Sequence, residues 1–243
     1  MAKNHTENMT VLEHIGELRN RIIVIVVAFI IAVVFSFTQA DYIRHLIASP
    51  IEGFSLVYFS PPEAFMANLR IAVMVGIFLV LPVIIYEILA FLFPGLYKRE
   101  KKFAVGVSGG ILFFFVAGVL FAYFVVMQLV LQFFLGFQTA QLSPTFNVSN
   151  YISFVFNLLL VFGLFFQLPV LFWVLGKMGL ITADTLKSKR KYAILIMLGA
   201  AALITPPDVI SQVILIGPLF VLYELGVWAV VINERKKTDE TAA

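Results

Sequence analysis

Acidic and basic side chains precede the first long apolar run of the sequence at a spacing that suits a binding site. Glu13 and Glu17 lie four residues apart, so they share one face of a helix. Glu17 also lies four residues before Arg21, with which it can form a surface salt bridge. The carboxylate can instead receive a cationic ligand, since a guanidinium offers a bidentate fork that a lysine ammonium cannot copy. The residues alone leave both interpretations open.

A second carboxylate, Glu100, lies in the connection 93–103 between two apolar runs. Four basic residues surround it: Lys98, Arg99, Lys101 and Lys102. Glu100 either neutralises these neighbours or acts as a second ligand beside Glu17. Two separated carboxylates suit a ligand that carries two adjacent arginines.

Three polar side chains lie inside apolar runs, where an exposed charge costs several kcal/mol. They are Glu87, Gln167 and Glu224. Gln167, two residues before Pro169, either hydrogen-bonds within the helix bundle or lines a polar concavity. Glu87 and Glu224 lie nearer the ends of their runs, where their carboxylates can reach the membrane surface.

The stretch 203–212, "LITPPDVISQ", predicts a sharp turn between two helices. Its two prolines end the first helix, and Asp208 stands where the next helix needs an N-cap. Thr205 and Gln212 then lie at an edge that faces lipid. These polar groups would suit a partner helix that carries one polar residue.

Catalytic and cofactor chemistry finds little support. The stretch "GVSGG" at 106–110 matches a G-x-S-x-G nucleophile pattern, but a serine nucleophile needs an adjacent base. His5, His14 and His45 all lie outside the apolar runs, and the chain has no cysteine. It also has no phosphate-binding loop motif. We therefore expect no enzyme, metal or cofactor, and close helix packing at these glycines.

Composition assigns the 243-residue chain to a broad class. Hydrophobic residues make up 61% of it and charged residues 13%, against roughly 25% charged in an average soluble domain. A soluble core of this size cannot bury so much apolar surface, which predicts an all-α, polytopic membrane protein. The net charge of +3 is mild, and we expect no nucleic-acid partner.

Six apolar runs predict six transmembrane helices in one domain, 1–233. The spans are about 22–37, 69–93, 103–134, 151–175, 192–204 and 209–232. The fifth would be only about 20 Å long as a helix, against roughly 30 Å of hydrocarbon. The remaining residues, 234–243, form a polar tail that we expect to be disordered.

Lysine and arginine placement predicts the orientation, because basic residues concentrate in cytoplasmic connections. With the N-terminus in the cytoplasm, 15 of the 17 Lys and Arg residues lie on the cytoplasmic side, and only Arg44 and Arg70 do not. Both termini are then cytoplasmic. In the first outer connection, "SPPE" (Ser60 to Glu63) is typical of a helix start.

Seven stretches resemble the TatC family, the polytopic subunit of the twin-arginine protein translocase, in that family's order and spacing. They are "EHIGELRNR", "SPPEAFMANLRIA", "LPVIIYEILAFLFPGLYKREKK", "GVLFAYFVV", "YISFVFNLLLVFGLFFQLPV", "MGLIT" and "LITPPDVISQVILIGPLFVLYELGV". Each is a weak motif alone. Together they cover nearly the whole chain and are specific.

The resemblance implies a six-helix, N-in/C-in bundle shaped like a concave, cupped hand, with short fifth and sixth helices. It implies a receptor in the cell membrane for the Arg-Arg signal peptides of folded cargo. The implied partners are single-span subunits of the TatA/TatB type and further copies of the chain within the lipid bilayer. Transport would draw on the proton-motive force.

The resemblance also implies roles for residues that match the family's motifs. Glu17 and Glu100 would contact the arginine pair of the signal peptide. The other matched positions are Arg19, Phe91 and Pro94 for receptor function, Pro50 and Asp208 for transport on the outer side, and Thr205 and Gln212 for docking partner helices.

The sequence departs from the family's pattern at two positions. Well-studied relatives carry Glu in the middle of the fourth helix, where this chain has Gln167. An amide can hydrogen-bond there but cannot titrate. Glu87 stands where a relative has Gln. Compared with such relatives, this chain has a carboxylate at 87 and an amide at 167.

The alternative interpretation is a secondary transporter or channel for a small solute. Broken helices and polar groups near the midplane are typical of such proteins, and Pro82, Pro169 and Pro218 offer breaks. The sequence shows no paired halves, however, and few membrane-embedded charges.

Overall fold

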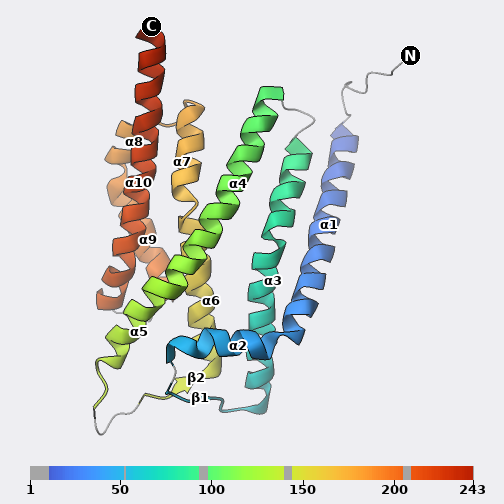
Figure 1. The fold of residues 1–243 in the computed structure, drawn as a ribbon, viewed down its shortest axis with the longest axis vertical. Helices are drawn as coiled ribbons and strands as arrows, with labels where there is room; N and C mark the ends of the chain where they lie inside the picture. The colour runs from blue at the N-terminus through green and yellow to red at the C-terminus, as the bar shows by residue number, and fades with distance from the viewer. Residues whose placement is uncertain (1–10, 52, 93–97, 140–143, 205–208, 243) are drawn as a thin grey trace. The chain divides into compact units, whose positions relative to one another are not determined.

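The structure is a computed structural model that describes residues 11–51, 53–92, 98–139, 144–204 and 209–242. Nearly all of this part of the chain is helical (Figure 1). The helices are α1 (Val11–Thr38), α2 (Ala40–Ala48), α3 (Pro61–Leu92), α4 (Lys98–Phe121), α5 (Met127–Leu135), α6 (Val148–Phe165), α7 (Leu168–Lys177), α8 (Ala183–Ser188), α9 (Arg190–Ile204) and α10 (Val209–Ala242). The predicted all-α class is confirmed.

Five helical stretches in the described residues are long and apolar enough to cross a membrane. They are Ile15–Thr38, Pro61–Phe91, Lys102–Leu135, Val148–Lys177 and Val209–Arg235. They coincide with five of the six predicted spans. The remaining one corresponds to α9, whose 15 residues give a helix of about 22 Å, so the fifth helix is short as predicted.

The last helix differs from the prediction in two ways. The expected short sixth helix is wrong, because α10 is a 34-residue helix that passes through Pro218. The expected disorder of the tail is also wrong, because α10 continues to Ala242. The reason is local. No Gly or Pro interrupts the chain after Gly226, and the Glu, Arg, Lys and Ala residues of the tail favour helix.

The third predicted span is one helical run with an irregular turn. Helix α4 passes through a π-helical turn, Ala122–Val126, into α5 without an intervening loop. Ala122 and Val126 are fully buried. The wider turn inserts one extra residue into the helix, which no apolar pattern reveals.

The predicted helix start at Ser60 to Glu63 is confirmed. Helix α3 begins at Pro61, and the Glu63 amide donates to the Ser60 carbonyl at 3.0 Å. The Glu63 carboxylate accepts the Phe59 amide at 2.8 Å and the side-chain amide of Asn147. The second bond ties this helix start to the N-cap residue of α6.

Two short strands, which the sequence did not predict, lie beside this helix start. Strand β1 (Leu56–Val57) pairs in parallel with β2 (Phe146–Asn147), with Leu56 opposite Phe146. The pairing joins the two longer connections of the chain. The 3₁₀ turn Ser49–Ile51 precedes β1 and contains Pro50.

The chain divides into two compact units, of which the first comprises Met1–His45 and Phe65–Leu112. In it, α1 and α3 pack side by side and antiparallel (Figure 1). Phe37 meets Phe65 with ring centroids 6.0 Å apart. Gly76 allows a close approach, since a Cβ there would lie 2.7 Å from Val33 Cγ2. This packing brings the N-terminal half of α1 to the C-terminal half of α3.

The second unit comprises Leu46–Ala64 and Phe113–Ala243. Glycines allow close helix contacts in it, since a Cβ on Gly118 of α4 would lie 2.8 Å from Phe166 Cβ and 2.9 Å from the Phe162 carbonyl oxygen. Helix α10 packs against α7 in the same manner, at Gly226 beside Phe172. Small residues here permit close helix packing in a membrane.

Candidate functional site

Glu17 and Arg21 form an ion pair on α1. They lie one helical turn apart, so their side chains meet on one face. Arg21 donates to Glu17 Oε1 from both Nε, at 3.1 Å, and Nη2, at 2.5 Å. The salt bridge that the spacing allowed is therefore present, and one carboxylate oxygen of Glu17 accepts both hydrogen bonds from the Arg21 guanidinium.

A second carboxylate reaches the same arginine from α3. Arg21 Nη1 donates to Glu87 Oε2 at 2.9 Å. The side chains of Glu17, Arg21 and Glu87 are 19%, 21% and 12% exposed. We call these three residues the carboxylate–arginine cluster. With two acids and one base, the cluster carries one more negative than positive charge.

One atom of the cluster is left without a bond. Glu17 Oε2 is out of contact with solvent and has no hydrogen-bond partner among the described residues. A buried carboxylate oxygen without a donor is costly. The arrangement therefore leaves one acceptor unfilled, and one added positive charge would balance the charge of the cluster.

Glu87 is the member of the cluster whose role the sequence did not reveal. Its position near the end of an apolar run suggested a carboxylate that reaches the membrane surface. In the structure it instead pairs with Arg21, 66 residues away. A contact over that distance depends on the packing of α1 against α3, so no local spacing signals it.

The other residues expected near the arginine pair belong to the same unit. Arg19 is exposed on α1, and Phe91 is half-buried near the end of α3. Glu100 lies in the first turn of α4, and its side chain is outside the described part of the chain. Pro94 lies outside the described residues.

Gln167 lies at a break in the fourth apolar run. Pro169 cannot donate a backbone hydrogen bond, and the run is divided into α6 and α7 at this point. The backbone N–H of Gln167 donates to the Leu164 carbonyl oxygen at 3.0 Å, and the side-chain Nε2 of Gln167 donates to the Gly163 carbonyl oxygen at 3.2 Å. Its Oε1 is buried without a partner in the described residues.

Glu224 is held by an arginine rather than standing alone at the membrane surface. Arg190, at the start of α9, donates from Nε and Nη2 to its two oxygens, both at 2.7 Å. This pairing raises the pKa of Arg190 above its ordinary value. The side chains are 44% and 33% exposed, so the pair contributes little to stability.

The residues expected on the outer side are partly described. Pro50 is half-buried in its 3₁₀ turn, and Gln212 is half-buried in the first turn of α10. Thr205 and Asp208 lie outside the described residues.

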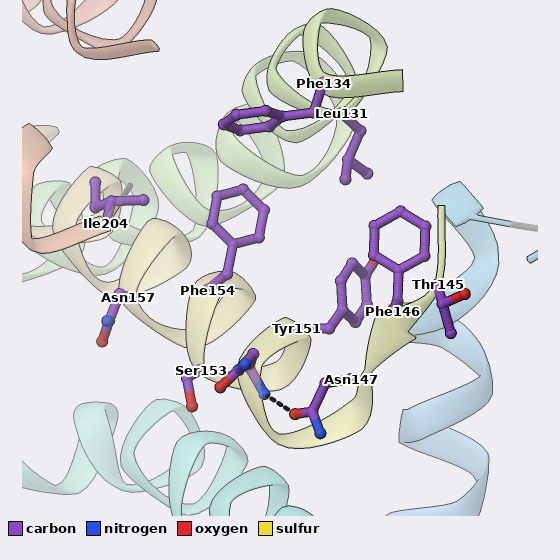
Figure 2. A pocket seen from close by; sticks show the side chains of 11 residues that line it. Leu131, Phe134, Thr145, Phe146, Asn147, Tyr151, Ser153, Phe154, Asn157 and Ile204 are labelled. Carbon is purple, nitrogen blue, oxygen red and sulfur yellow. Dashed lines mark hydrogen bonds between the residues drawn. The ribbon is translucent and has the colours of Figure 1, made fainter. Parts of the chain in front are cut away.

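A hollow of about 580 Å³ lies beside α6 in the second unit (Figure 2). Polar side chains at helical spacing line one side of it: Asn147, Asn150, Ser153 and Asn157. Most of the other lining side chains are apolar, among them Leu131, Phe134 and Phe154. The hollow extends to Ile204, the last residue of α9, where Asn157 Nδ2 donates to the Leu203 carbonyl at 3.2 Å.

The serine of the G-x-S-x-G pattern has a helical role. Ser108 Oγ donates to the carbonyl of Ala104, four residues earlier in α4, at 2.9 Å. Such a bond is ordinary for a serine inside a helix. A Cβ added to Gly106, Gly109 or Gly110 would meet nothing within 4 Å, so the expected close packing at these glycines is wrong within the described structure.

Comparison with known proteins gives consistent sequence matches. Residues 13–218 match the family described as "Sec-independent protein translocase protein (TatC)". The TatC protein of Carboxydothermus hydrogenoformans is 40% identical over 223 residues, which cover 90% of this chain and 92% of that protein. The TatC protein of Aquifex aeolicus is 38% identical over 237 residues, which cover 95% and 98%.

Solved structures agree with these matches. A crystal structure described as "Twin Arginine Translocase Receptor- TatC" superposes with a TM-score of 0.81 at 37% identity, and covers 91% of this chain and 100% of that chain. A second, of the same receptor in the detergent DDM, gives a TM-score of 0.79. The chain therefore belongs to the TatC family of Sec-independent protein translocase proteins, and is a multi-pass membrane component of a protein translocase.

Proposed function

We propose that this chain is the receptor and core subunit of a twin-arginine translocase, and that it binds the Arg-Arg signal peptide of folded cargo at its cytoplasmic face. One observation carries the proposal: the carboxylate of Glu17 already holds a guanidinium, that of Arg21, in this structure. Glu17 thus has the geometry for arginine. The family relationship and the surplus negative charge of the carboxylate–arginine cluster support the same role.

In this proposal two acids receive the arginine pair. Glu17 takes one arginine and Glu100 takes the other, with Arg19, Phe91 and Pro94 shaping the site. Glu17, Glu87 and Glu100 belong to one compact unit, which supports a shared site. Pro50 and Asp208 serve transport on the outer side, and Gln167 supplies a polar amide within the membrane.

Partner helices dock at the C-terminal end of the short fifth helix, α9. Thr205 and Gln212 would receive a polar side chain from single-span subunits of the TatA/TatB type. The polar-lined hollow that ends at Ile204, the residue before Thr205, supports a polar docking edge there. Further copies of the chain assemble with it, and the proton-motive force drives export.

The proposed topology has six spans and both termini in the cytoplasm, with α9 as the short fifth span. We expect a fluorescent protein fused after Ala243 to fold and fluoresce in bacterial cells. We expect alkaline phosphatase inserted into the connection 135–150 to be active, because it folds only outside the cytoplasm. Alkaline phosphatase without activity at 135–150, together with a C-terminal fluorescent protein that does not fluoresce, would contradict the orientation.

Photo-crosslinking tests the proposed receptor site. A signal peptide carrying a photo-reactive residue beside its arginine pair should crosslink within 13–21 or 98–103 of the purified chain. A matched peptide with a Lys-Lys pair should give little product there, since lysine lacks the guanidinium fork. Crosslinks confined to the outer connections would contradict the site.

The small-solute transporter is the competing function, and the break at Gln167 is the observation that favours it. Saturable uptake of a small solute by proteoliposomes that contain this chain alone would support that function instead. We expect no such uptake, because the proposed role is to bind a peptide and recruit partners.

A further inference from the structure

The structure places an arginine of the chain itself on the carboxylate that the proposed function assigns to a cargo arginine. We propose that Arg21 is an internal competitor for Glu17, and that Glu87 holds Arg21 when the cargo arginine takes its place. Arg21 and Glu87 would then be positioning residues that set how tightly Glu17 binds its ligand. This inference rests on the proposed function, because it concerns the same carboxylate.

The first step of the argument is that Glu17 offers no other accessible acceptor. Oε1 carries two N–H groups of Arg21, at 3.1 and 2.5 Å. Oε2 is out of contact with solvent, so a ligand does not reach it while the cluster keeps this arrangement. A guanidinium that arrives from solvent therefore has to replace Arg21.

The second step is that Arg21 keeps an ion pair after it leaves Glu17. Its third bonded N–H goes to Glu87, at 2.9 Å, and that carboxylate is only 12% exposed. An arginine without a partner in such surroundings would be strongly unfavourable. Because Glu87 comes from α3 rather than α1, it stays in place when the α1 pair separates.

The third step concerns charge. Before the exchange, two carboxylates share one guanidinium; afterwards, each carboxylate has its own. The cluster of Glu17, Arg21 and Glu87 gains one positive charge and becomes neutral. The exchange thus replaces one Glu17 ion pair by another of the same chemical type and completes the charge balance.

Competition of this kind lowers the affinity of every ligand that takes Glu17. The net affinity of a ligand is the difference between its own bond to Glu17 and the bond that Arg21 gives up. The bond of Arg21 is subtracted equally from an arginine and from a lysine ligand, so the ratio of their affinities still depends on the fork that lysine lacks. Only a ligand whose own bond to Glu17 matches the two donors of Arg21 then binds tightly.

Four forms of the full-length protein in detergent test the inference: wild type, Arg21→Gln, Glu87→Gln and the double variant. For each, the Kd of an Arg-Arg and of a Lys-Lys signal peptide is measured by fluorescence anisotropy. The double variant is decisive, because it removes one charge of each sign and keeps the net charge of wild type. Asp184→Asn, an exposed acid on α8, is the control for loss of an acid elsewhere.

We expect the double variant to bind the Lys-Lys peptide about tenfold tighter than wild type does, since close charge pairs contribute at least about this factor. The affinity for the Arg-Arg peptide should rise by a similar factor, so the ratio of the two affinities stays as in wild type. Glu87→Gln alone should weaken Arg-Arg binding about tenfold, because displaced Arg21 then has no partner.

Unchanged affinities of both peptides in the double variant would overturn the inference, and would leave Arg21 and Glu87 as a tie between α1 and α3. If Arg21→Gln does not fold, Arg21→Lys keeps the charge and removes the fork, and should raise the affinity for both peptides in the same direction. Failure of the proposed function looks different: wild type would then show no preference for Arg-Arg, or Glu17→Ala would leave the preference unchanged.

Discussion

Glu17→Ala should weaken binding of an Arg-Arg signal peptide to the purified protein by about 30-fold or more. Losing one partner of a desolvated charged pair costs on the order of 2–5 kcal/mol, and tenfold in affinity corresponds to about 1.4 kcal/mol. Glu17 is 19% exposed and already binds a guanidinium, so it lies in this desolvated class. Isothermal titration of the peptide into the detergent-solubilised protein measures the change.

Two further variants define what the loss at Glu17 means. Glu17→Gln keeps the shape of the side chain and should lose most of the same affinity, since the charge is what the arginine requires. Asp184→Ala removes a carboxylate that is 95% exposed and should change the Kd by less than about twofold. Equal losses in Glu17→Ala and Asp184→Ala would mean that only the general negative charge attracts the peptide.

Gly118→Ala should destabilise the protein by about 1–3 kcal/mol, the usual cost of overpacking a close contact. A methyl group there would lie 2.8 Å from Phe166 Cβ and Cγ and 2.9 Å from the Phe162 carbonyl oxygen. None of these atoms is the free end of a flexible side chain, so the helices themselves have to move apart. The loss of folded protein on heating in detergent, followed by size-exclusion chromatography, measures it.

Gly109→Ala on the same helix is the matched control. A Cβ at Gly109 meets nothing within 4 Å, and alanine favours helix over glycine by up to about 1 kcal/mol. This variant should keep or raise the midpoint temperature of unfolding, while Gly118→Ala lowers it. Equal midpoints for the two variants would mean that the approach of α4 to Phe166 is not tight in the folded protein.

The parts of the fold that depend on local sequence could be predicted. Apolar runs of spanning length give long helices, and the signal from Ser60 to Glu63 starts α3 at the expected residue. The short fifth helix follows from the number of apolar residues before the prolines at 206 and 207. Glu17 and Arg21 could be paired from their spacing of one helical turn.

The parts that depend on packing could not. The bond between Arg21 and Glu87 needs α1 and α3 to lie antiparallel at one register, which Val33 and Gly76 set at a distance from the site. The pairing of Leu56 with Phe146 joins two connections far apart in the sequence. Each contact depends on two segments that lie far apart in the sequence. The hydrophobic period along one segment does not reveal which second segment it will contact.

The last helix shows a different kind of error. The polar composition of residues 234–242 suggested disorder, and the resemblance suggested a short helix. Six of these nine residues are Glu, Arg, Lys or Ala, which favour helix, and a helix that is already nucleated extends at low cost. Continuation of α10 to Ala242 is therefore consistent with local preference, which the polarity argument had overlooked.

The most direct test of the central claim compares Arg-Arg and Lys-Lys signal peptides on the wild-type protein, by anisotropy at two salt concentrations. We expect the Arg-Arg peptide to bind at least about tenfold tighter, and expect the preference to persist at higher salt because Glu17 is mostly shielded from solvent. Equal affinity for the two peptides would contradict the account, because a carboxylate site built around a guanidinium has to distinguish arginine from lysine.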